Sequence, residues 1–158
     1  MGEAKTVKTP NEADLDTAEG SVSRLRTGPT VKPARSGRVL VIDDEAPVGR
    51  TIQRLLGDRH EVVVVTSGAE AMELIEAGSD FDVILCDMSM PEMTGIDVHE
   101  AAIACRPELA DRFVFMTGGS FSPRTREFFD SSATTRIDKP FDLEALRALV
   151  RDRVARIH

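Results

Sequence analysis

The sequence has no long hydrophobic run and no excess of positive charge. No apolar stretch approaches the roughly 18 residues typical of a membrane-spanning helix, and the first residues lack the apolar core of a secretory signal. The net charge of −7 argues against binding of nucleic acid by this chain alone. We therefore expect a cytoplasmic protein that contacts neither a membrane nor nucleic acid directly.

Cysteine is also scarce. The two cysteines, Cys86 and Cys105, close an expected strand and the helix that follows it, so they should lie at opposite ends of one domain. We expect both to be reduced core residues instead of a disulfide, which agrees with a reducing cytoplasm.

Residues 1–37 lack aromatic residues and contain few large aliphatic ones. Threonine, proline, glycine, serine and charged residues dominate this segment. Such a composition buries too little apolar surface to offset the entropy lost on ordering. The sequence predicts that 1–37 is a disordered tail or interdomain linker.

Residues 38–158 alternate between strand and helix patterns. Short apolar runs predict strands at 39–42, 61–65, 83–86, 113–116 and 136–138. Amphipathic spacing predicts helices at 47–56, 68–77, 96–105, 123–129 and 143–157. Regular alternation demands parallel strands joined by right-handed crossovers. The expected fold class is therefore α/β: a doubly wound five-stranded parallel sheet, (βα)5 and flavodoxin-like, in a single domain with a disordered N-terminal tail.

Polar residues of different kinds follow the expected strands. They are Asp43 and Asp44, Asp87, Thr117 and Lys139. In a parallel sheet the carboxyl ends of the strands share one rim, where ligands bind in this fold class. Carboxylates gathered there repel one another, and a hard cation such as Mg²⁺ relieves that repulsion. A metal, an ammonium and a hydroxyl around one carboxylate suit a phosphoryl group, with the carboxylate as nucleophile.

Each of these residues also has an ordinary structural explanation. Asp44 could cap the following helix, Thr117 could open a turn, and Lys139 could simply end a strand. Their joint occurrence on successive strand ends is what favours a phosphoryl site.

The same motifs resemble those of response-regulator receiver domains. They are Val41-Ile42-Asp43-Asp44-Glu45, Ile84-Leu85-Cys86-Asp87-Met88-Ser89-Met90-Pro91 with Gly95, Met116-Thr117-Gly118, and Ile137-Asp138-Lys139-Pro140-Phe141. The resemblance covers about residues 38–158 and extends to the C-terminal receivers of hybrid histidine kinases.

The resemblance implies a role for each matching residue. Asp87 would accept a phosphoryl group from a histidine kinase or phosphotransfer domain, in cis or in trans, and the resulting conformational switch would control a downstream partner. Asp43, Asp44 and the Ser89 backbone carbonyl would hold Mg²⁺ together with Asp87. Thr117 and Lys139 would bind the phosphoryl oxygens, and Lys139–Pro140 would be a cis peptide. Such a domain is not an enzyme in the usual sense, although it promotes its own phosphorylation and dephosphorylation.

One position departs from the family pattern. Receiver domains usually carry Phe or Tyr three residues before the strand-five lysine, where this chain has Arg136. Because a guanidinium is permanently charged, we expect Arg136 to remain outward, along the surface of the last two helices. We expect His60 and His99 to be solvated and without a role as phosphate carriers.

Three functional alternatives remain open from the residues. The chain is either a free single-domain regulator or the receiver part of a hybrid kinase. A Mg²⁺-dependent phosphohydrolase also uses a strand-end aspartate, but usually has a second aspartate two residues later, where this chain has Ser89. A degenerate receiver that only binds proteins would not need the complete set of acidic residues, Thr117 and Lys139.

Overall fold

A computed structural model describes residues 36–157. The tail or linker predicted at 1–37 therefore lies outside the described residues, apart from its last two positions. Within the described part, no helix combines the length and apolar character that crossing a bilayer would require.

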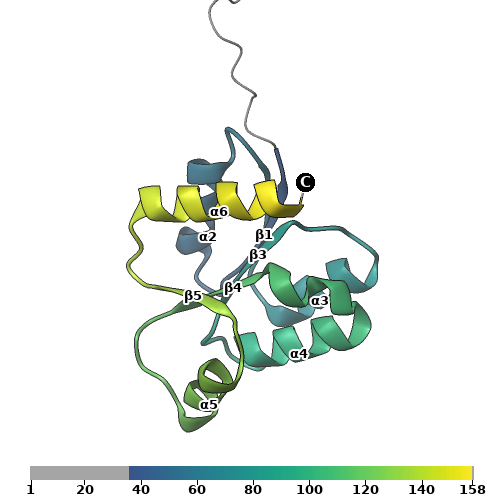
Figure 1. Cartoon of the computed structure of the whole chain (residues 1–158), viewed down its shortest axis with the longest axis vertical. Coiled ribbons are helices and arrows are strands. Elements are labelled where there is room, and N and C mark those ends of the chain that lie inside the picture. Colours follow the sequence, from purple (N-terminus) through teal and green to yellow (C-terminus); the bar gives the residue numbers. More distant parts are fainter. Residues whose placement is uncertain (1–35, 158) are drawn as a thin grey trace, which may run out of the picture. The chain divides into compact units, whose positions relative to one another are not determined.

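Strands and helices alternate along the described chain (Figure 1). In order, they are β1 (Arg38–Ile42), α2 (Ala46–Leu56), β2 (Glu61–Val65), α3 (Gly68–Glu76), β3 (Val83–Asp87), α4 (Gly95–Cys105), the 3-10 helix η1 (Pro107–Arg112), β4 (Phe113–Thr117), α5 (Pro123–Ser131), β5 (Thr135–Asp138) and α6 (Leu143–Ile157).

The five strands form one parallel sheet in the order β2-β1-β3-β4-β5. The chain starts at β1, moves outward to β2, and then crosses to β3 and on to β5. This reversal makes the sheet doubly wound, so the predicted fold is confirmed. It also places a topological switch point between β1 and β3, whose carboxyl ends carry the candidate acidic residues.

The sheet is covered on both faces, as Figure 1 shows for α2 and α6 on one side and α3 and α4 on the other. β3 and β4 are buried along their whole length. This explains why their sequences are continuous apolar runs instead of alternating patterns. β5 is an edge strand with exposed positions, as its polarity predicts.

Helix ends follow the sequence signals. Asp142 caps α6 by accepting hydrogen bonds from the backbone N–H groups of Glu144 and Ala145, at 2.9 and 3.2 Å. Thr94 and Asp97 form a reciprocal capping box at the start of α4, which fixes where the loop after β3 ends.

For several side chains, the predicted burial or exposure is wrong. Cys105 is exposed, although Cys86 is buried and both are free thiols. The apolar spacing of the last helix also places Leu143 on the same stripe as the buried Leu146, but Leu143 is 43% exposed because it lies in the first turn, before the helix reaches the core. His60 and His99 are buried, not solvated.

His99 is buried among aromatic rings. Its imidazole lies 5.0 Å from the ring of Phe113 and 5.3 Å from that of Phe128, centroid to centroid. Burial lowers the pKa of His99, which favours the neutral imidazole that such an apolar setting requires. Phe128 belongs to α5, which contains no buried residue and meets the core only through its partly buried phenylalanines.

Candidate functional site

Three carboxylates meet at the carboxyl edge of the sheet. Oxygens of Asp43, Asp44 and Asp87 lie within 4.8 Å of one another. Asp43 and Asp87 are buried, whereas Asp44 is exposed. β1 and β3 are neighbours in the sheet, so their adjacent ends bring the acidic residues together as the sequence predicts.

Asp87 is the most perturbed carboxyl group of the site. Burial, followed by the charge of Asp43, raises the pKa of Asp87 from 3.8 to about 6. The ammonium of Lys139 and a hydrogen bond from the Ser89 N–H to Oδ1, at 3.3 Å, act in the opposite direction. Burial and the neighbouring carboxylate thus disfavour the ionised form of Asp87.

Lys139 supplies the only positive side chain of this cluster among the described residues. Its Nζ lies 2.9 Å from Oδ2 of Asp43 and 3.6 Å from Oδ1 of Asp87. Burial lowers the pKa of Lys139, but its hydrogen bond to Asp43 and the charge of Asp87 outweigh burial and raise the pKa overall. The Lys139–Pro140 peptide is cis, as predicted.

The loop after β3 is held tightly against the acceptor strand. The Gly95 N–H donates to the Met88 carbonyl at 3.1 Å. A Cβ at position 95 would lie 2.7 Å from the Asp87 carbonyl oxygen, so only glycine permits this approach. Ser89 lies in this loop, and its amide, not its side chain, contacts the Asp87 carboxylate.

Thr117 is buried at the end of β4 and has a partner that the sequence argument missed. Its hydroxyl donates to Oδ1 of Asp138 at 2.8 Å. The two residues are paired across β4 and β5, where each is the last residue of its strand. The sequence contains a signal for this contact, because both residues end neighbouring strands and paired residues in neighbouring strands point to the same face of the sheet.

Arg136 is exposed, which agrees with the predicted outward orientation. Its guanidinium carbon lies 5.0 Å from the ring centroids of both Phe121 and Phe129. It therefore packs on aromatic rings at and before α5, and its charge is held by cation–π attraction on the surface. The sequence predicts a side chain along the surface of the last two helices, whereas the rings on which it packs belong to α5 and to the loop before it.

The donor set suits a hard divalent cation. The carboxylate oxygens are close enough to share one ion, and oxygen ligands are those that Mg²⁺ prefers. Their mutual repulsion and the raised pKa of Asp87 are what a bound cation would relieve. The residues present thus fit Mg²⁺.

This geometry is that of a phosphoacceptor domain: an α/β sheet edge with an acidic cluster, a lysine and a hydroxyl. Comparison with known proteins agrees. The profile of the response regulator receiver domain matches residues 39–151. The chain belongs to this family, whose members are phosphoacceptor signalling domains of two-component systems.

The relatives include both regulators and kinases. The chain is 31% identical over 121 residues to the transcriptional regulatory protein ZraR of Escherichia coli, a match that covers 76% of this chain and 27% of ZraR. It is 29% identical over 119 residues to the sensor kinase CckA of Brucella abortus, covering 74% of this chain and 12% of CckA. A solved receiver domain from the hybrid histidine kinase CckA superposes with a TM-score of 0.61 at 26% identity, covering 75% of this chain and 99% of that domain.

The matched region is thus a module found in longer proteins of different architecture. Receiver domains exchange phosphoryl groups with histidine kinases or phosphotransfer partners, and they generally bind Mg²⁺ at an acidic pocket. The chain spans about a quarter of ZraR and about an eighth of CckA.

Proposed function

We propose that Asp87 is the phosphoacceptor of this receiver domain. The observation that carries the proposal is the position of Asp87: buried at the end of β3, within reach of two further carboxylates and of Lys139. Asp43, Asp44, Asp87 and the Ser89 backbone carbonyl are the proposed ligands of Mg²⁺. When bound, the cation supplies positive charge that offsets the charge of the transferring phosphoryl group.

Each side chain has its own role in the proposed phosphoryl transfer. An Asp87 carboxylate oxygen forms the bond to phosphorus while the bond from phosphorus to the donor nitrogen breaks. The Lys139 ammonium turns from Asp43 and Asp87 to a phosphoryl oxygen, and the Thr117 hydroxyl donates to another. Hydrolysis of the acyl phosphate by water returns the carboxylate and releases inorganic phosphate, so the phosphorylated intermediate of both steps is the domain itself.

Position 89 favours this reaction over that of a phosphohydrolase. Ser89 has no acidic side chain with which to protonate a leaving alkoxide, and its amide already donates to Asp87. Retention of the acidic cluster and Lys139 favours phosphorylation over simple protein binding.

The donor is a histidine kinase or phosphotransfer domain, in the same chain or another, and the proposal places both in the cytoplasm, where ATP is available. As either a free regulator or a hybrid-kinase receiver, the domain would switch conformation to control a partner protein, without contacting nucleic acid or membrane itself.

The metal assignment is tested with Asp44→Asn. Because Asp44 is exposed, its removal should leave the fold intact but take away one proposed ligand. We expect Mg²⁺ affinity to fall at least tenfold, about 1.4 kcal/mol, in isothermal titration calorimetry. Calorimetry is used because the chain has no tryptophan or tyrosine whose fluorescence could report metal binding. Asp130→Asn, an exposed position on α5, is the matched control and should bind Mg²⁺ normally. Equal affinities in the two variants would remove Asp44 from the site.

Asp138 gives a second test. Thr117 must leave Asp138 before its hydroxyl can reach a phosphoryl oxygen, so their hydrogen bond opposes the phosphorylated state. A hydrogen bond of this kind contributes a net stabilisation of about 0.5–1.5 kcal/mol. We therefore expect Asp138→Ala to bind the phosphoryl mimic beryllofluoride roughly two- to tenfold more tightly. Calorimetric titration with Mg²⁺ and beryllofluoride measures this. Weaker binding would mean that Asp138 supports the active arrangement instead.

A further inference from the structure

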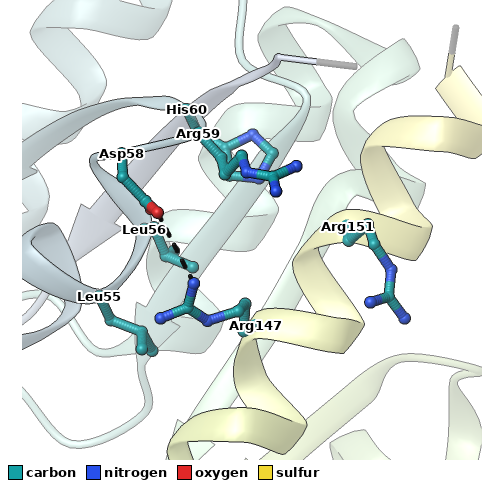
Figure 2. A pocket seen from close by; sticks show the side chains of 7 residues that line it. All are labelled: Leu55, Leu56, Asp58, Arg59, His60, Arg147 and Arg151. Carbon is teal, nitrogen blue, oxygen red and sulfur yellow. Dashed lines mark ion pairs between the residues drawn. The ribbon is translucent and has the colours of Figure 1, made fainter. Parts of the chain in front are cut away.

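The two buried histidines of the described chain lie in opposite surroundings. Figure 2 shows His60 beside charged side chains, among them Arg59 from the same loop. Nδ1 of His60 accepts a hydrogen bond from the Gly37 N–H at 3.1 Å, so this ring has a polar partner. His99 is equally buried, at 8% exposure, but its Nδ1 has no hydrogen-bond partner within residues 36–157. Because nearly all buried polar atoms are paired, the position of His99 indicates a role beyond packing.

Aromatic rings from two other elements surround His99. On β4 they are Phe113 and Phe115, whose ring centroids lie 5.0 and 5.6 Å from that of the imidazole. On α5 the ring is that of Phe128, at 5.3 Å and with 79° between the ring planes. Phe115 and Phe128 also contact each other, at 5.3 Å. His99 thus lies between the sheet and α5, among side chains that offer no hydrogen-bond acceptor.

The position of α5 depends on these ring contacts. The helix has no buried residue, and its phenylalanines are only partly buried. Its ion pairs join Arg124 to Asp97 and Glu100 of α4, at 3.0 and 3.4 Å. All three of these side chains are at least 34% exposed, so the ion pairs contribute little to the attachment. The attachment of α5 therefore depends mainly on its phenylalanine rings, and Phe128 packs directly on His99.

Protonation of His99 conflicts with this arrangement. An imidazolium carries a proton on each ring nitrogen, so its Nδ1–H would be a buried donor among phenylalanine rings. Burial lowers the pKa of His99, and the charge of Glu100, the one described charged group that acts on the ring, raises it by less. Glu100 is itself paired with Arg124 of α5, and the rings of β4 and α5 carry no charge. The docked helix therefore selects the neutral form of His99.

We propose that His99 makes the attachment of α5 sensitive to acid: neutral His99 holds the helix on β4, and protonated His99 releases it. Opening of α5 takes Phe128 away and lets water reach the imidazole, so the pKa of His99 returns toward its ordinary value of 6.5. Since the open form then binds a proton more tightly than the docked form, the ratio of open to docked α5 rises as the pH falls below 6.5. For a single proton the rise is at most about tenfold per pH unit.

The release of α5 does not require phosphorylation. α5 follows the loop that begins after Thr117, so its release would give the domain a second input to the same helix. That effect on signalling rests on the proposed function, whereas the opening itself does not. Experiments on the metal-free chain without a phosphodonor therefore test the opening independently of Asp87 as the phosphoacceptor.

Hydrogen exchange of the α5 amides measures the release. Exchange is followed in chelator at about pH 7.5, 6.5 and 5.5, and each rate is compared with that of an unstructured peptide at the same pH. We expect the protection of α5 to fall several-fold between pH 6.5 and 5.5. The imidazole resonances of the three histidines are titrated by NMR in the same samples, and the pKa of His99 should lie below 6.5. The ion pair of Arg124 with Asp97 stays ionised over this range, because a hydrogen bond from the Thr94 N–H lowers the pKa of Asp97 from 3.8.

Substitutions separate His99 from the other titrating groups. His99→Phe removes the titrating nitrogens and keeps a ring between β4 and α5, so the protection of α5 should no longer change with pH. His99→Leu, which is smaller, should behave in the same way and covers the case in which a larger ring disturbs packing. His60→Gln is the matched control: it removes the other buried imidazole, retains an acceptor for the Gly37 N–H, and should keep the acid dependence of α5. Constant α5 protection in the unaltered chain, an acid dependence that survives in the His99 variants, or a His99 pKa of 6.5 or above would overturn the proposal.

Discussion

Replacing Asp87 by alanine or asparagine is expected to abolish phosphorylation of the chain. With Mg²⁺ and a small acyl phosphate, the unaltered protein should gain the mass of one phosphoryl group. Neither variant should gain it, because neither side chain offers a carboxylate oxygen to form the bond to phosphorus. Intact-mass spectrometry measures the result directly.

Asp130→Asn, at an exposed position of α5, is the matched control and should be labelled like the unaltered protein. Chelator should remove labelling from both, since the developing charge at phosphorus would then face Asp43 and Asp44 without a cation. Full labelling of the Asp87 variants, or undiminished labelling in chelator, would assign the acceptor elsewhere.

The same Asp87→Asn substitution is expected to stabilise the metal-free fold. The Asp87 pKa is raised from 3.8 to about 6, so between these values the folded chain holds a proton that the unfolded chain has lost. Stability therefore falls as the pH rises through this window, and the penalty is complete above it. The difference between 3.8 and about 6 already includes the attraction of Lys139, and it corresponds to an upper value of about 3 kcal/mol.

Denaturant unfolding in chelator measures this effect at two pH values. At pH 8 the Asn variant should have the larger free energy of unfolding. The difference should shrink as the pH falls through this window and disappear well below 3.8, where Asp87 is protonated in both the folded and the unfolded chain. A variant that is less stable than the unaltered protein at pH 8 would mean that Lys139 more than compensates the repulsion.

The sequence predicts those parts of the molecule whose pattern is decided locally. β3 is recognisable because a strand buried on both faces must be apolar throughout, and Asp87 is recognisable because it ends that run. Parallel connectivity then places Asp43 beside it without further information. Gly95 belongs to a recognisable motif, but its reason, close contact with the Asp87 backbone, appears only in the folded chain.

The errors concern side chains whose surroundings come from distant elements. His99 looks polar on its own helix, yet β4 and α5 surround it with phenylalanine rings. Cys105 looks apolar, but it is the last residue of α4 and lies beyond the covered part of the helix. Arg136 was correctly placed outward, since the cost of burying a guanidinium depends little on context. Its partners Phe121 and Phe129 depend on how α5 docks, which no local pattern encodes.

α5 is attached to the rest of the domain much more lightly than the central strands. β3 and β4 are covered on both faces, so their amides should exchange with solvent only when the whole domain unfolds. α5 has no buried residue and should open at a much lower free energy, as a separate unit. The hydrogen bond from Thr117 to Asp138 and the stacking of Arg136 join the loop and rings around α5 to β5. A movement of Thr117 would therefore reach β5 and the rings around α5, whereas the fully buried acceptor strand would stay in place.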